Sequence, residues 1–242
     1  MGAAMTTIAT QRVSPSLDRL FYSGMALAIA VVIFTGFAPS YFLRSPAFAG
    51  PPLTPLVHLH ASLAASFVLL LVLQTWLVAG RQLPIHRKLG WVGAALAAAI
   101  VVVGPFVAIA TVQRGALPPG LTAPLFMILP LGGLVTFAIF IGAGVLMRNS
   151  AETHKRLMLL GTISVLDAGF ARMPGILEMG PMVFYGLADI FLVVAVVYDL
   201  LTRRRVHPVW LWGGSLLILS QPLRLMLAQT EAWAGFITVL TG

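Results

Sequence analysis

Residues 56–80, LVHLHASLAASFVLLLVLQTWLVAG, decide the fold, because this stretch contains no Asp, Glu, Lys or Arg. A helix needs about 20 mainly apolar residues to cross the roughly 30 Å hydrocarbon core of a bilayer. Similar stretches recur along the chain at residues 20–39, 88–112, 124–147, 155–172, 181–201 and 208–228. Together with residues 56–79 they predict an all-α, polytopic transmembrane helical bundle of about seven spans.

The composition of the chain agrees with this expectation. Of the 242 residues, 59% are hydrophobic and 9% are charged, whereas a soluble domain carries about 25% charged residues. The lipid bilayer is therefore the expected surrounding. The chain has no cysteine, which excludes disulfides, iron–sulfur clusters and cysteine nucleophiles.

The chain divides into three parts. Residues 1–19 form a polar N-terminal tail, residues 20–228 the transmembrane bundle, and residues 229–242 a short C-terminal segment. The C-terminal segment is too short to cross a bilayer and contains Trp233, so we expect an interfacial helix there.

Basic residues are distributed unevenly between the two ends of the expected bundle. Eleven of the 15 lysines and arginines lie in the N-terminal tail and in the loops after the second, fourth and sixth spans. This bias predicts a cytoplasmic N-terminus and an outward C-terminus. We call the predicted cytoplasmic side the inner end and the opposite side the outer end. Because the net charge of +8 is scattered over these loops, nucleic-acid binding is not expected.

A short motif recurs in the inner loops. Residues 86–93 read HRKLGWVG, residues 154–161 read HKRLMLLG, and residues 203–214 read RRRVHPVWLWGG. Each places a histidine beside basic residues at the expected start of a helix. The motif suggests three related helical hairpins behind the first span.

These three histidines, His86, His154 and His207, are the first candidate site. They share a depth at the inner end, and imidazole binds haem iron, copper and zinc. Two of them on neighbouring helices could hold haem b, and all three could hold a transition metal. The alternative is that they lie among lipid phosphates or cap helices.

The outer half offers two further candidates. His58 and His60 start the second span, but residues two apart point to different faces of a helix, so we do not expect them to share one metal ion. We expect His60 to face the bundle. Intramembrane charge is the other candidate, because an ionisable group at such depth costs roughly 3 kcal/mol and marks function by default.

The charged candidates share one level of the bundle. Helical rise places Asp167 and Arg224 about 20 and 24 Å from the inner edge, and Asp189 about 12 Å from the outer edge. They form an expected polar site with the neighbouring Gln221, Arg172 and Tyr185. The alternative is an ion pair, Asp189 or Asp167 with Arg224, that only holds spans together.

Four strings carry a resemblance: QTWLVAGRQLPIHRKLGW, ETHKRLMLLGTISVLDAGFARMP, GLADIFLVVAVVYDLLTRRRVHPVWLWGG and SQPLRL. Together they resemble a family of uncharacterised bacterial multi-pass membrane proteins. The resemblance implies a bacterial inner membrane and no established activity. It also marks motif positions, which are His60, His86, His154, Asp189, His207 and Arg224.

A more distant similarity is carried by the turn at His86–Gly90, HRKLG. It is similar to helix starts in cytochrome b561-like and haem A synthase-like bundles, which bind haem between paired histidines. Here only the inner end offers a full pair, so a two-haem relay is not expected.

Three functions follow from these candidates. The first is a redox or cofactor protein whose inner histidines bind haem or a metal, with a quinone or a membrane redox protein as partner. The second is a transporter, sensor or ion-coupled protein using the polar site in the outer half. The third is a structural or assembly subunit. Whether the chain is an enzyme stays open.

Overall fold

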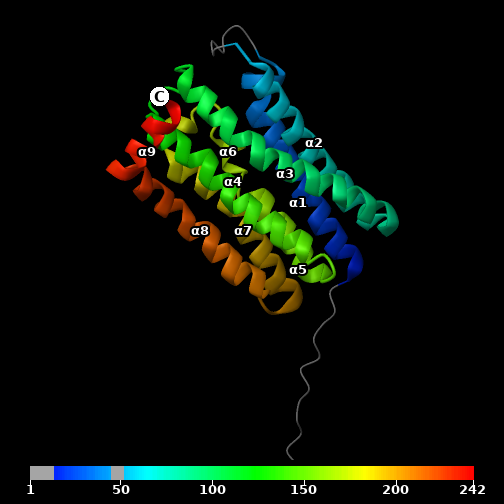
Figure 1. Ribbon diagram of the computed structural model, residues 1–242. Helices are drawn as coiled ribbons and strands as arrows, with labels where there is room; N and C mark the ends of the chain where they lie inside the picture. Colours follow the sequence, from blue (N-terminus) through cyan, green and yellow to red (C-terminus); the bar gives the residue numbers. More distant parts are fainter. Residues whose placement is uncertain (1–13, 45–51) are drawn as a thin grey trace, which may run out of the picture.

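A computed structural model describes residues 14–44 and 52–242, and within them it is a bundle of helices (Figure 1). Residues 1–13 of the expected tail lie outside the described residues. The helices are α1 (Pro15–Phe37), α2 (Pro55–Ala79), α3 (Leu83–Gln113), α4 (Ala123–Leu146), α5 (Ala151–Ile163), α6 (Asp167–Phe170), α7 (Pro181–Arg203), α8 (Pro208–Ala228) and α9 (Glu231–Thr241). A π-helical turn, Ala38–Phe42, extends α1, and a 3-10 turn, Leu177–Met179, precedes α7.

Six of the described helices are long and apolar enough to cross a membrane: α1, α2, α3, α4, α7 and α8. Their outward faces carry large apolar side chains such as Leu69, Val102 and Phe106. Such faces require lipid in place of water. The chain is therefore an integral membrane protein in contact with a bilayer, as its composition predicts.

The predicted fifth span, 155–172, differs from the expectation because it is not one helix. It divides into α5, a turn at residues 164–166, and the four-residue α6. The hydroxyl of Ser164 donates to the carbonyl of Gly161 at 2.7 Å, in place of a continuing helical ladder. The 13 residues of α5 rise only about 20 Å, less than a bilayer core.

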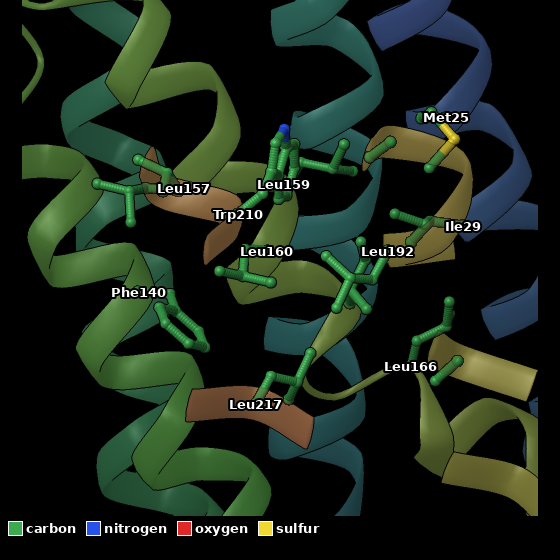
Figure 2. Packing of buried hydrophobic residues seen from close by; sticks show 14 residues of the cluster. Met25, Ile29, Phe140, Leu157, Leu159, Leu160, Leu166, Leu192, Trp210 and Leu217 are labelled. Atoms are coloured by element: carbon green, nitrogen blue, oxygen red, sulfur yellow. The ribbon is translucent and has the colours of Figure 1, made fainter. Parts of the chain in front are cut away.

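The broken segment still passes along the bundle. In Figure 1, α5 lies toward the end where α1 begins, and α6 lies toward the opposite end. The main core cluster places α5 among α1, α4, α7 and α8, with Leu157, Leu160 and Leu166 fully buried (Figure 2). An irregular backbone at membrane depth is tolerated where protein shields it from lipid, and these four helices provide that shield.

The ends of the bundle follow from the alternation of the long helices. α1, α3, α5 and α8 begin at the inner end, whereas α2, α4 and α7 begin at the outer end. α1 starts at Pro15, so Asp18 belongs to the helix and not to the tail. The C-terminal α9 is the expected short helix, and the indole N–H of its Trp233 donates to the carbonyl of Pro124 at 2.9 Å. Its interfacial position and the membrane orientation stay predictions.

Candidate functional site

A buried ion pair joins α5 to α7 near the inner end. Arg156 donates from Nε and Nη2 to the two carboxylate oxygens of Asp199, at 2.9 and 2.6 Å. Both side chains have no exposed surface. The indole N–H of Trp210, in α8, donates to Asp199 at 2.9 Å. Two-point charged hydrogen bonds are the strongest kind in proteins, so this group holds three helices in register.

A second acid, Asp18, ties α1 into the same region. Its carboxylate accepts a hydrogen bond from the hydroxyl of Tyr198 at 2.9 Å and one from Nη2 of Arg203 at 2.6 Å. Lys155 forms an ion pair with it as well. The ring of Tyr198 also stacks on Phe21, with ring centres 3.8 Å apart. α1 is therefore attached to both α5 and α7.

We call these charged groups the inner network, and it contains as many acids as bases. Its members are Asp18, Glu152, Asp199, Lys155, Arg156 and Arg203. Each member forms at least one ion pair within the set, so the formal charge is zero. A buried charge without a partner would be very costly. The inner network joins helices, and its charged members are paired with one another. Beside it, the hydroxyl of Tyr22 is buried without a partner among the described residues, and the ring of Tyr22 lies 5.0 Å from Nζ of Lys155.

Beside the network, the structure brings two of the three inner histidines together. The ring centres of His86, in α3, and His154, in α5, lie 6.3 Å apart with the planes nearly perpendicular. Nδ1 of His154 lies 2.8 Å from the carbonyl oxygen of Gly144. Because a carbonyl only accepts, Nδ1 carries the proton and Nε2 keeps a free lone pair in the neutral ring.

Two polar atoms near this pair have no described partner. Nδ1 of His86 and Oε1 of Gln74 are buried without a hydrogen bond among the described residues. Gln74 lies against α3 one turn beyond His86, since a Cβ added at Gly90 would be 3.9 Å from its Nε2. Buried polar groups are rarely left unpaired in proteins, so this place has spare capacity for a ligand, a metal ion or water.

His207 has a different role from the one predicted with the other two. It is the N-cap of α8, where its Nδ1 accepts the hydrogen bond of the Val209 N–H at 3.2 Å. Across residues 14–44 and 52–242, no group of three or more His, Asp or Glu side chains could hold a metal ion. The expected three-histidine metal site is therefore wrong for the described chain, because the third imidazole is used in capping.

The two outer histidines face different ways, as their spacing predicts. His58 is exposed, and its Nδ1 lies 3.0 Å from the hydroxyl of Tyr41. His60 points toward α3, where its Cε1 would lie 3.5 Å from a Cβ added at Gly104. Nδ1 of His60 is buried without a described partner. The preference for His60 as the residue facing the bundle is confirmed.

In the outer half, Arg224 of α8 is the central group. Its side chain is buried, with 6% of the residue exposed. Nη2 donates to the hydroxyls of Thr136 and Ser220 at 2.9 and 3.0 Å. Nη1 is buried and has no hydrogen-bond partner in the described chain. Gly132 makes room for the guanidinium, because an added Cβ would come within 2.5 Å of Nε.

Two more buried groups face Arg224. Tyr185 of α7 is 2% exposed and its ring centre lies 5.9 Å from the guanidinium carbon. Its hydroxyl is close enough to Arg224 to interact with it but forms no hydrogen bond of normal geometry with a described residue. Asp167, at the start of α6, is 7% exposed and lies within electrostatic reach of Arg224 and Arg172. We call Arg224, Tyr185 and Asp167 the outer site.

The expected ion pair is not formed, because within the described residues neither Asp167 nor Asp189 pairs with Arg224 within 4.0 Å. Asp189 accepts a hydrogen bond from Nε2 of Gln221 at 2.9 Å instead. Arg172 donates to the carbonyl of Ala168 at 2.8 Å and covers the ring of Phe37 at 4.3 Å. The outer site thus leaves one arm of the Arg224 guanidinium and the hydroxyl of Tyr185 without a hydrogen bond among the described residues, which a purely structural bridge would not.

Comparisons of the chain with protein-family models, curated proteins and solved structures found no match. The resemblance to bacterial multi-pass membrane proteins therefore stays a prediction from the quoted strings. Function has to be argued from the two polar levels themselves.

Proposed function

We propose that the protein binds a small solute inside the membrane at the outer site and acts as a transporter or sensor. The observation that carries this proposal is the free Nη1 arm of Arg224, which is buried, charged and without a partner among the described residues. An ionisable group at this depth is costly, so one that keeps an unpaired donor is a functional candidate. The hydroxyl of Tyr185 adds a second free donor on the same side.

The broken helix beside the site supports the same function. Transporters commonly place their solutes near the middle of the membrane, where interrupted helices expose main-chain groups. Here the interruption at residues 164–166 lies directly before Asp167. The site therefore combines a cation, a carboxylate, a free hydroxyl and an irregular backbone, which together suit recognition of a polar solute.

Thermal unfolding of the purified protein in nanodiscs tests the proposal. Acetate, chloride and nitrate would be added singly, with neutral acetamide as the uncharged comparison. A ligand that binds the folded state raises the unfolding midpoint in proportion to ln(1 + [L]/Kd). We expect at least one anion to raise the midpoint, and Arg224→Gln to abolish the shift. If none of them shifts the wild-type midpoint, the proposal fails.

Arg114→Gln is the matched control, because Arg114 also lies at the outer end but is exposed and bonded to main-chain carbonyls. It should respond to the ligand as the wild type does. Uptake of the stabilising anion into proteoliposomes then separates a transporter from a sensor. The resemblance and the loop charges support a bacterial inner membrane as the location, which cell fractionation would check.

A second candidate function rests on the His86–His154 pair. Imidazole nitrogens bind metal ions at about 2.0–2.1 Å, so two rings that hold the same group have to lie side by side. The ring centres are 6.3 Å apart, and the main-chain anchor on His154 leaves its Nε2 free. His86 and His154 would hold a single transition metal or haem b. Either group would supply one-electron chemistry, with a quinone or a membrane protein as the redox partner.

An absorption spectrum and a metal analysis of the purified protein test this second function. A Soret band or about one metal ion per chain, lost in both His86→Ala and His154→Ala, supports it. His207→Ala is the matched control and should keep the signal, because His207 caps α8. A colourless, metal-free protein purified from cells supplied with haem and metals would rule this function out.

A further inference from the structure

The outer site contains one cation and one carboxylate that are close but not hydrogen-bonded to each other. Arg224 lies within electrostatic reach of Asp167, yet the described chain shows no ion pair between them within 4.0 Å. The formal charges of this pair cancel when nothing else is bound. Arg172, the other cation that acts on Asp167, is exposed and donates to the carbonyl of Ala168, so it is not counted with the buried pair. The Nη1 of Arg224 and the hydroxyl of Tyr185 can both donate a further hydrogen bond. An anion placed between them would accept from both groups and lie beside the positive charge.

Adding an anion to this pair leaves one uncompensated negative charge. In a low-dielectric interior such a charge carries a large penalty, which a bound counter-charge or a proton removes. Asp167 is the group of the outer site that can take up a proton and become neutral. With the proton on Asp167, Arg224 and the anion form a neutral pair.

The described groups around Asp167 include arginines and a tyrosine, and His60 lies within electrostatic reach of Arg172. The charged or titratable groups that act on it are Arg224 from α8, Arg172 beyond α6 and Tyr185 from α7. α1 packs against α6 through the apolar Val32 and Ile33 beside Gly169. Arginines stay protonated. Asp189, farther along α7, is already bonded to Gln221.

We propose that the ligand of the outer site is a small monovalent anion, and that each anion binds together with one proton held by Asp167. The anion accepts hydrogen bonds from Nη1 of Arg224 and from the hydroxyl of Tyr185, while the carboxyl group of Asp167 takes the proton. The net charge of the outer site is then the same with and without ligand. This inference rests on the proposed function, and in a transporter it makes anion movement proton-coupled.

Binding measured with acetate and with chloride between about pH 6 and pH 8 tests this inference, because both probes stay ionised there. One linked proton makes the affinity fall by up to about tenfold for each pH unit. In weakly buffered solution the wild type should also take up as much as one proton for each anion bound. A preference for acetate over chloride, or the reverse, shows whether the outer site favours a carboxylate or a halide.

Variants of Asp167 test whether this residue holds the proton. Asp167→Asn should bind the anion with a pH-independent affinity and no proton uptake, and Asp167→Glu should restore both. Asp189→Asn is the matched control and should keep the wild-type coupling. If Asp167→Asn does not fold, Asp167→Ser serves as the second non-titrating variant.

The outcomes separate the two proposals. Anion binding without proton uptake in the wild type, or unchanged coupling in Asp167→Asn, overturns the inference and leaves the proposed function standing. The absence of binding by any probe overturns the proposed function and the inference with it. The wild-type measurement alone decides this point, so it does not depend on the folding of any variant.

Discussion

Arg156 and Asp199 meet through two hydrogen bonds, of 2.9 and 2.6 Å, with no part of either side chain exposed. This pair lies at the crossing of α5 and α7, and Trp210 adds α8 to it. α5, which has only 13 residues, is thus held in the bundle by a buried ion pair as well as by its buried leucines. The consequences of breaking the pair are testable.

Removing one partner should destabilise the protein strongly. Asp199→Leu leaves Arg156 buried with Glu152 as its ion-pair partner but without its bidentate acceptor. Arg156→Met removes the two-point partner of Asp199 and leaves its buried carboxylate with Arg203 and Trp210. Breaking a buried pair in this way costs about 3–5 kcal/mol. Thermal unfolding in detergent would show either single variant melting well below the wild type.

The double variant Arg156→Met/Asp199→Leu separates charge from packing. With both charges removed, the loss should be much smaller than for either single variant, because no unpaired charge remains. Arg205 is exposed in the loop between α7 and α8. Arg205→Ala should therefore change stability by less than about 0.5 kcal/mol. Equal losses in the single and double variants would contradict this account.

Close approach of α1 to α6 gives a second prediction. A Cβ added at Gly36 would overlap the main-chain carbonyl of Gly169, whereas one added at Gly24 in the same helix meets nothing within 4 Å. Overpacking typically costs 1–3 kcal/mol, so we expect Gly36→Ala to lose about that much or more, since backbone cannot yield easily.

Gly24→Ala is its matched control, and it should be neutral or stabilising by up to about 1 kcal/mol, since alanine favours the helix. Unfolding midpoints measured side by side decide the matter. Similar midpoints for both variants would mean that α1 and α6 do not pack as described.

The spans could be predicted because their signal is local. Stretches such as residues 56–79 contain enough apolar residues in a row to define a crossing helix by themselves. The break in the fifth span could not be predicted in the same way. It depends on the shielding of Leu157 and Leu160 by four other helices, and no proline or glycine at residues 164–166 marks it.

The candidate sites, too, could be predicted only in part. The depth of Asp167, Asp189 and Arg224 follows from counting residues, but their partners depend on helix rotation, so Asp189 bonds to Gln221 and not to Arg224. The sequence presents Arg156 only as one of the basic residues of the inner loops. One signal was available: the chain has only seven acids, and Asp18 and Glu152 stand in first helical turns at the basic end.

The room around Arg224 supports a third prediction. Gly132→Ala should displace the guanidinium, because the new methyl group would come within 2.5 Å of Nε. We expect a loss of about 1–3 kcal/mol in stability and the loss of the anion-dependent shift. Gly142→Ala, in the same helix with open space around it, should retain both. Retention of full anion binding by Gly132→Ala would show that Arg224 does not need the space that Gly132 leaves.

The N-cap of α8 predicts a dependence of stability on pH. Nδ1 of His207 accepts the N–H of Val209, and a protonated ring could not accept it. Burial, and then the positive charge of Arg156, lower the pKa of His207 below its ordinary value of 6.5. The unfolded chain therefore binds more protons at this residue than the folded protein does. Stability from this group is present above about pH 6.5 and is lost as the pH falls toward the lowered pKa of the folded state.

His207→Asn isolates this effect, because asparagine is a good N-cap and does not titrate. Between about pH 7.5 and pH 5.5, around the ordinary histidine value, the unfolding midpoint of the wild type should fall more than that of the variant. Other groups, including Glu152, titrate in both proteins and cancel in the comparison. Parallel midpoints across this range would show that the cap hydrogen bond is unaffected by protonation, and the proposed tautomer of His207 would then be wrong.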